Sequence, residues 1–184
     1  MAALFWQFLI YSFFGFLLEV VFARATRARK QDRKCMLLLP LCPVYGVGAL
    51  LIVHLPAGVR GRPVLLFLLG ALSATAVEYA VDWLYEKALG VRFWDYSALP
   101  WNLNGRVCLP FSAVWGLLSL PLTAWVHPAV ARWVSAIPAG WTLPAALLFL
   151  LDLGFTVYLL RTTGATGTLR WYDRFRRAGR EQRS

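Results

Sequence analysis

Four carboxylate side chains lie inside stretches of otherwise apolar residues, and they are the groups in this chain best placed to do chemistry. They are Glu19, Glu78, Asp82 and Asp152. An ionised acid is costly in hydrocarbon, so it normally faces a bundle interior, a wet cavity or a partner cation. Glu78 and Asp82 stand four residues apart, with Glu86 one turn further on, so a helix projects all three from one face. Like charges at this spacing repel, so we expect cations or a proton to neutralise them.

Two of the acids allow more than one interpretation. Glu19 stands near the end of its apolar stretch, where it either joins Glu78 and Asp82 at a similar membrane depth or pairs with Arg24 at the interface. Asp152 stands in the middle of the last apolar stretch with no helical neighbour of opposite charge. A conformational or ion-coupling role and a buried hydrogen bond to another helix both fit Asp152.

The elements that carry these acids are membrane helices. Hydrophobic residues make up 59% of the 184 residues and the mean hydropathy is +0.58, which exceeds the usage of soluble domains. Only helices or closed barrels satisfy the backbone in lipid, and no run of alternating ten-residue strands is present. We predict an all-α polytopic bundle in one domain, residues 1–160, with an ordered loop at 85–109 and a basic tail at 161–184. The predicted spans are 4–22, 37–55, 64–84, 110–127 and 141–160, each near the 20 residues that cross the bilayer.

The charge distribution predicts the orientation of this bundle. The formal net charge is +10, but the basic residues gather after the first predicted span, in the 85–109 loop and after the last span. Only Arg60, Arg62 and Arg132 fall on the other side. The positive-inside bias therefore places the N-terminus outside and the C-terminus in the cytoplasm of a cell inner membrane. The same bias accounts for the net positive charge, so nucleic-acid binding is not needed to explain it. The first span lacks the preceding basic region and the small-residue cleavage site of a secretory signal peptide, so we expect it to stay attached.

The segment 93–109 is too aromatic for a plain solvated loop and too broken by proline and glycine for a helix. We expect an ordered loop that is re-entrant or caps the acids, since irregular backbone is tolerated there when protein buries it. Arg106 is the predicted counter-ion for Asp82, Glu78 or Asp95, because its planar fork holds a carboxylate bidentately. A salt-bridged latch and a site for an anionic ligand both fit this arginine.

Other polar and small residues have simpler interpretations. Cys35, Cys42 and Cys108 lack zinc spacing, so we expect reduced thiols, no metal and no cofactor. Gly46 and Gly48 follow Pro43 at the start of the second span, where close helix packing is favoured over a local unwinding that exposes carbonyls to an ion.

Several motifs together make the chain similar to a known family. They are Glu19 before a basic loop, Leu41-Cys42-Pro43-Val44-Tyr45-Gly46-Val47-Gly48, Glu78-Tyr79, Trp94-Asp95-Tyr96-Ser97, Asn102-Leu103-Asn104-Gly105-Arg106-Val107-Cys108-Leu109 and Trp115-Gly116. In these motifs, over roughly residues 10–120, the chain resembles the putative ABC-transporter type IV membrane proteins. Asp152 lies outside the pattern.

The resemblance implies a transport role, and the acids and the orientation described above add the expectation of a permease-like subunit with a polar pocket that faces the cytoplasm. The residues expected to bind or gate a solute or proton are Glu19, Glu78, Asp82, Asp95, Asn102 and Arg106, with Tyr45, Tyr79 and Cys108 in secondary positions. The sequence contains no G-x-x-x-x-G-K-[ST] phosphate loop, so a nucleotide-driven pump would need a separate ATPase chain. We also expect membrane lipids as partners and a homo-oligomer.

Two other functions stay open at this point. One is an intramembrane enzyme that acts on a lipid-linked substrate, with Asp95 or Glu78 as acid or base and Cys108 as nucleophile. His54 and His127 are expected at the outer ends of their spans, on the opposite side of the membrane from Cys108, so neither can serve as its base. The other is a non-catalytic assembly or regulatory subunit, since internal ion pairs can be purely structural.

Overall fold

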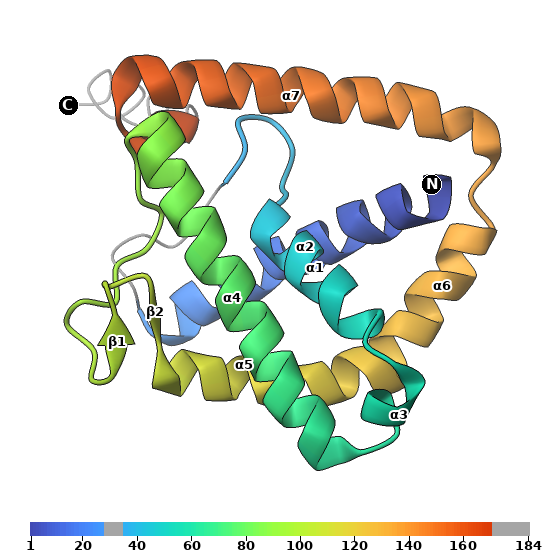
Figure 1. Ribbon diagram of the computed structural model, residues 1–184. Coiled ribbons are helices and arrows are strands. Elements are labelled where there is room, and N and C mark those ends of the chain that lie inside the picture. The colour runs from blue at the N-terminus through green and yellow to red at the C-terminus, as the bar shows by residue number, and fades with distance from the viewer. Residues whose placement is uncertain (28–34, 171–184) are drawn as a thin grey trace.

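The computed structural model describes residues 1–27 and 35–170, and it confirms the all-α class (Figure 1). The parts of the predicted basic loop and tail at 28–34 and 171–184 lie outside the described residues. Within the described part, four helical stretches are long and apolar enough to cross a membrane: α1 Ala2–Ala25, α4 Pro63–Leu89, Leu109–Ser135 and Ala139–Thr163. Short helices α3, Ala57–Arg60, and η3, Thr166–Leu169, flank α4 and the last stretch.

The third of these stretches is irregular. It consists of α5 Leu109–Pro121, the π-helical segment η1 Leu122–Val126 and α6 His127–Ser135. Pro121 has no N–H to give to the carbonyl one turn back, so the regular hydrogen-bond ladder cannot continue through it. A π-helical turn absorbs the mismatch, and α6 turns away from the line of α5 (Figure 1). The fourth stretch comprises the short η2, Ala139–Trp141, and α7, Thr142–Thr163.

The prediction of a fifth full-length helix, at 37–55, is wrong. The helix in this window, α2, covers only Pro43–Val53. Its 11 residues span about 16 Å at 1.5 Å per residue, roughly half of the hydrocarbon core. Residues 36–42 before it are non-helical and loop against α7 in Figure 1. This window is therefore half irregular chain and half helix.

The side chains of Asp152 and Thr156 on α7 accept hydrogen bonds from the backbone amides of the irregular half. The amides of Leu38 and Leu39 donate to the Asp152 carboxylate at 2.9 and 2.7 Å, and the amide of Leu37 donates to Thr156 Oγ1 at 2.9 Å. Asp152 is 1% exposed. Of the two roles that fit this acid, the structure shows the buried hydrogen bond, made to irregular backbone instead of to another helix.

Glycines allow the helices of the bundle to approach closely. α2 packs on α1 and α4, and α4 packs on α5. A Cβ at Gly46 would lie 2.3 Å from Ser12 Oγ on α1, and a Cβ at Gly70 would lie 2.6 Å from Ser119 on α5. These contacts are the small-residue packing expected between membrane helices. α1, α4 and α7 all end, and α5 begins, toward the left of Figure 1, so the 90–108 loop and the acids of α4 share one end of the bundle. Which side of the membrane that end faces stays a prediction.

Candidate functional site

A tight hairpin in the 90–108 loop brings Arg106 back to α4. β1 Asn102–Leu103 pairs antiparallel with β2 Val107–Cys108. Asn104 and Gly105 between them have φ of 55° and 68°, and the Arg106 amide donates to the Leu103 carbonyl at 3.0 Å. Two successive left-handed residues make a type I′ turn, for which Asn-Gly is the favoured pair. The turn reverses the chain and directs Arg106 toward α4.

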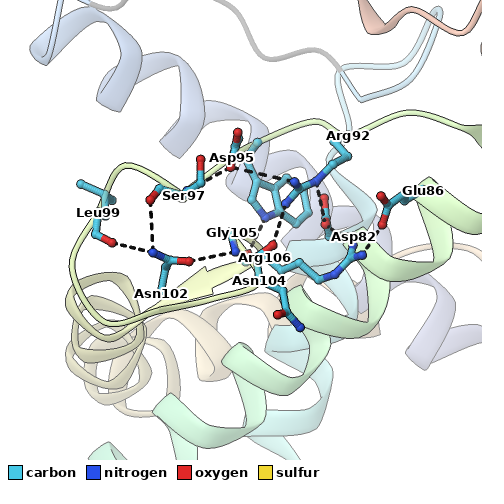
Figure 2. Close-up of polar contacts among 11 residues, drawn as sticks. Asp82, Glu86, Arg92, Asp95, Ser97, Leu99, Asn102, Asn104, Gly105 and Arg106 are labelled. Atoms are coloured by element: carbon cyan, nitrogen blue, oxygen red, sulfur yellow. Dashed lines mark hydrogen bonds and ion pairs between the residues drawn. The ribbon is translucent and has the colours of Figure 1, made fainter.

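Arg106 meets two of the three α4 carboxylates. Its Nη1 lies 2.5 Å from Asp82 Oδ2, and its Nη2 donates to Glu86 (Figure 2). The bond to Glu86 raises the pKa of the Arg106 guanidinium above its already high ordinary value. Arg92 Nε reaches the same Asp82 oxygen at 3.3 Å. Asp82 is fully buried, so this ion cluster is a latch that ties both ends of the loop to one helix.

Neighbouring polar groups hold the latch and its hairpin in place. Trp94 Nε1 donates to the Arg106 carbonyl at 2.8 Å, and the guanidinium lies 5.6 Å from the ring centre of Tyr79. Asn104 Nδ2 donates to the Tyr79 hydroxyl at 2.9 Å. Asn102 accepts from the Gly105 amide at 3.0 Å and donates to the Leu99 carbonyl at 2.8 Å, as Figure 2 shows. Tyr79 and Asn102, both predicted site residues, therefore position the loop.

Asp95 belongs to the outer side of this loop. Its Oδ1 accepts from the Ser97 amide at 2.9 Å, and Arg92 Nη1 lies 3.9 Å away. The hydrogen bond from Ser97 holds the pKa of Asp95 below its ordinary value. The Asp95 side chain is 58% exposed, so it caps a turn at the surface of the loop.

A partly open cavity of about 590 Å³ lies beside the latch, lined by residues of α1, α2, α4, the α5–η1–α6 stretch and the loop residues Phe93, Trp94 and Tyr96. Its lining is largely apolar and aromatic, and Glu19 and Glu78 are the acidic side chains that line it. Asp82 and Arg106 do not line it. Pro121 and the η1 residues Leu122, Trp125 and Val126 do, so the irregular part of the third stretch faces this space.

The two acids of the cavity are held by aromatic side chains. Tyr45 OH donates to Glu19 Oε1 at 2.5 Å. Tyr96 OH and Trp115 Nε1 donate to the two oxygens of Glu78, at 2.9 and 3.1 Å. Tyr45 and Trp115 contact each other edge to face, with ring centres 5.4 Å apart. Four elements, α1, α2, α4 and α5, thus converge on this polar end.

The residues expected to share one polar pocket are divided in the structure: Glu19 and Glu78 line the cavity, and Asp82 and Arg106 do not. Arg106 forms ion pairs with Asp82 and Glu86, so the structure separates the latch from the cavity that Glu19 and Glu78 line. Neither Glu78 nor Asp95 is a partner of Arg106 among the described contacts. Of the two functions that fit Arg106, its geometry is that of the salt-bridged latch.

Sequence reasoning missed several members of the site. The helical spacing puts Glu86 on the same face as Glu78 and Asp82 but assigns it no partner. Arg92, Tyr96 and Trp115 also contact the acids of α4, and the sequence assigns them no part in the site. Cys108, the predicted nucleophile of the enzyme alternative, is 1% exposed and lies outside the cavity lining. Across residues 1–27 and 35–170, no three His, Cys, Asp or Glu side chains gather as a metal site.

Comparison with known proteins returns a family match. The model of the family described as "Putative ABC-transporter type IV" matches residues 6–159. The match covers most of α1 through most of α7, so it takes in the cavity, the latch and Asp152. A search of curated proteins and a search of solved structures each found no match.

Proposed function

The chain belongs to the putative ABC-transporter type IV family, and from this premise we propose that it is a permease-like transport subunit whose cavity takes up the solute. Its four long apolar helices make it a multi-pass membrane protein. The cavity, at about 590 Å³, falls in the range of roughly 300–1,000 Å³ that is usual for small-molecule sites. We place the protein in a cell inner membrane, as a homo-oligomer working with a separate ATPase chain.

The observation that carries this proposal concerns Gly48 of α2. Gly48 is buried and lines the cavity, yet a Cβ built on it would meet no atom within 4 Å. Gly46, one half-turn earlier, would clash with α1 at 2.3 Å. A buried backbone position that faces open space is unusual, because protein interiors are close-packed. The backbone of α2 therefore borders unfilled space at Gly48.

The backbone around the gap also supports a transport role. The irregular segment 36–42 precedes α2, which lines the cavity, and the π-helical segment η1 lines it as well. Broken and irregular helices inside a membrane protein are typical of sites where a solute or ion is bound in transporters. The latch adds a closing device, because the loop between Arg92 and Arg106 contributes Phe93, Trp94 and Tyr96 to the cavity wall.

The test is to fill the gap without disturbing the packing around it. Gly48→Trp places an indole in the cavity, so we expect it to abolish solute flux while the protein still folds and inserts. The matched control is Gly154→Trp on α7, because Gly154 is also helical, would meet no atom within 4 Å of a Cβ, and lies on an exposed face. Both variants should elute as monodisperse protein after detergent extraction.

Flux is measured without assuming a substrate. Cells of the source organism that lack the chain are complemented with wild type, Gly48→Trp or Gly154→Trp, and the small molecules in cells and medium are compared by mass spectrometry. The proposal expects compounds whose distribution depends on wild type and Gly154→Trp and not on Gly48→Trp. If Gly48→Trp complements as well as wild type, the cavity does not carry a solute and an assembly or regulatory role takes its place.

A further inference from the structure

The chemistry of the cavity wall also identifies what kind of solute it fits. Glu78 is 7% exposed, and its carboxylate accepts hydrogen bonds from two neutral donors, Tyr96 OH and Trp115 Nε1. Arg92 forms ion pairs with Asp82 and Asp95, and Arg106 forms ion pairs with Asp82 and Glu86. Among the described residues that line the cavity, none is Lys, Arg or His. Glu78 therefore has no basic side chain beside it on the described cavity wall, and a proton or a cationic ligand can balance its charge.

Aromatic rings surround this carboxylate. Tyr45, Tyr96 and Trp115 all line the cavity beside Glu78. The faces of tyrosine and tryptophan attract cations, most strongly where water is excluded. A buried carboxylate and aromatic faces together favour an organic cation over an anion.

The rest of the cavity favours an apolar body on that cation. Away from Glu78 the lining is made of side chains such as Phe14, Ile52, Trp125 and Trp133. A hard inorganic cation takes about six oxygen ligands or more, and the described residues contain no group of three or more His, Cys, Asp or Glu side chains that could hold a metal ion. A cavity of about 590 Å³ with one polar end matches a molecule with a single charged head and a large apolar or aromatic body.

We infer that the cavity binds amphiphilic organic cations, with the charged head against Glu78 and the apolar body toward Trp125 and Trp133. This inference rests on the proposed function, since it names the class of solute that the same cavity would carry. Glu19 also lines the cavity and accepts a hydrogen bond from Tyr45.

The experiment uses two probes of the same shape and opposite charge. The full-length protein is placed in nanodiscs of zwitterionic lipid, and equilibrium binding of radiolabelled tetraphenylphosphonium is compared with that of tetraphenylborate. We expect saturable binding of the cation, tighter than that of the anion by about tenfold or more. Glu78→Gln should remove this preference, and Gly48→Trp should abolish binding of both probes. Gly154→Trp should bind as wild type does.

The wild-type comparison alone can overturn the inference, so it does not depend on any variant folding. Equal or tighter binding of tetraphenylborate refutes the cation preference, and so does the lack of saturable cation binding. Binding that survives in Gly48→Trp refutes the location. If neither probe binds while Gly48→Trp still blocks flux, the solute class is wrong and the transport proposal stands. If the cation binds but Gly48→Trp leaves flux unchanged, the cation site stands and the transport proposal fails.

Discussion

Asp152 is the side chain on which the irregular half of the second membrane segment depends. Its two oxygens accept the amides of Leu38 and Leu39, at 2.9 and 2.7 Å, and it is 1% exposed. A hydrogen bond to a charged group contributes about 1.5–3 kcal/mol, so replacing Asp152 by leucine should cost about 3–6 kcal/mol for the two bonds. Water cannot take over these amides inside the bilayer, so the loss should not be compensated.

Graded substitutions separate the hydrogen bonds from the volume of the side chain. Asp152→Asn keeps the shape and one acceptor oxygen, so we expect about half of the loss seen in Asp152→Leu. Thr156→Val removes the single neutral bond from the Leu37 amide, at 2.9 Å, and should cost about 1 kcal/mol. Thr163→Val is the control, because Thr163 is exposed and its Oγ1 bonds the Leu159 carbonyl of its own helix.

The assay is the free energy of unfolding of each variant in bicelles, obtained from a denaturant titration of the full-length protein. The predicted order of loss is Asp152→Leu, then Asp152→Asn, then Thr156→Val, with Thr163→Val near wild type. If Asp152→Leu is as stable as wild type, the amides of 38 and 39 find other partners, and the carboxylate is not what holds this segment.

Three further predictions concern stability. Gly46→Ala should lower the melting temperature, because its Cβ would lie 2.3 Å from a side-chain oxygen of α1. Gly48→Ala faces open space, so its higher helix propensity should stabilise the protein by about 1 kcal/mol. Thermal melts of the two purified variants test both predictions. Arg106→Gln should lower the melting temperature more than Arg106→Lys, because it leaves two carboxylates without their shared cation, and equal melts would contradict the latch. The Ser97 amide lowers the pKa of Asp95, so its stabilisation is present at neutral pH and lost as the pH falls below the ordinary aspartate value of about 3.9. Asp95→Asn should therefore show a smaller loss of melting temperature on acidification than wild type, and an equal loss would refute this.

Hydropathy predicts the all-α class and four of the five apolar segments, because each of those four is a helix that buries its own backbone bonds. It fails at 37–55, because it measures how apolar the side chains are and not whether the backbone can stay helical. Pro40 and Pro43 both interrupt that window, and each removes a backbone donor and disfavours helix in the residue before it. The partner that satisfies the irregular backbone, Asp152, is distant in sequence. Two features of the sequence point to this arrangement: an acid without a helical neighbour of opposite charge in the last apolar stretch, and two prolines in the second.

The sequence indicates which residues belong to the candidate site, but not which of them form the latch and which line the cavity. The i, i+4, i+8 spacing correctly places Glu78, Asp82 and Glu86 on one face of α4. Which of them contacts Arg106 depends on the hairpin that reverses the chain before it. The pair Asn104-Gly105 is the sequence signal for the type I′ turn of this hairpin. The division between latch and cavity arises from that tertiary contact, so a pattern along one helix could not reveal it.

The separation of Glu78 from Asp82 gives neighbouring turns of α4 different tasks. Arg92 and Arg106 bracket the loop that supplies a wall of the cavity, and both contact the same Asp82 oxygen, at 3.3 and 2.5 Å. Asp82 is consequently placed to govern whether that wall stays closed, while Glu78 is placed to meet what lies inside. A charged solute that entered against Glu78 would bring its field within about one helical turn of the Asp82 cluster, close enough in a low dielectric to bias the latch. The proposed binding at Glu78 is therefore expected to be coupled to the latch through one face of α4.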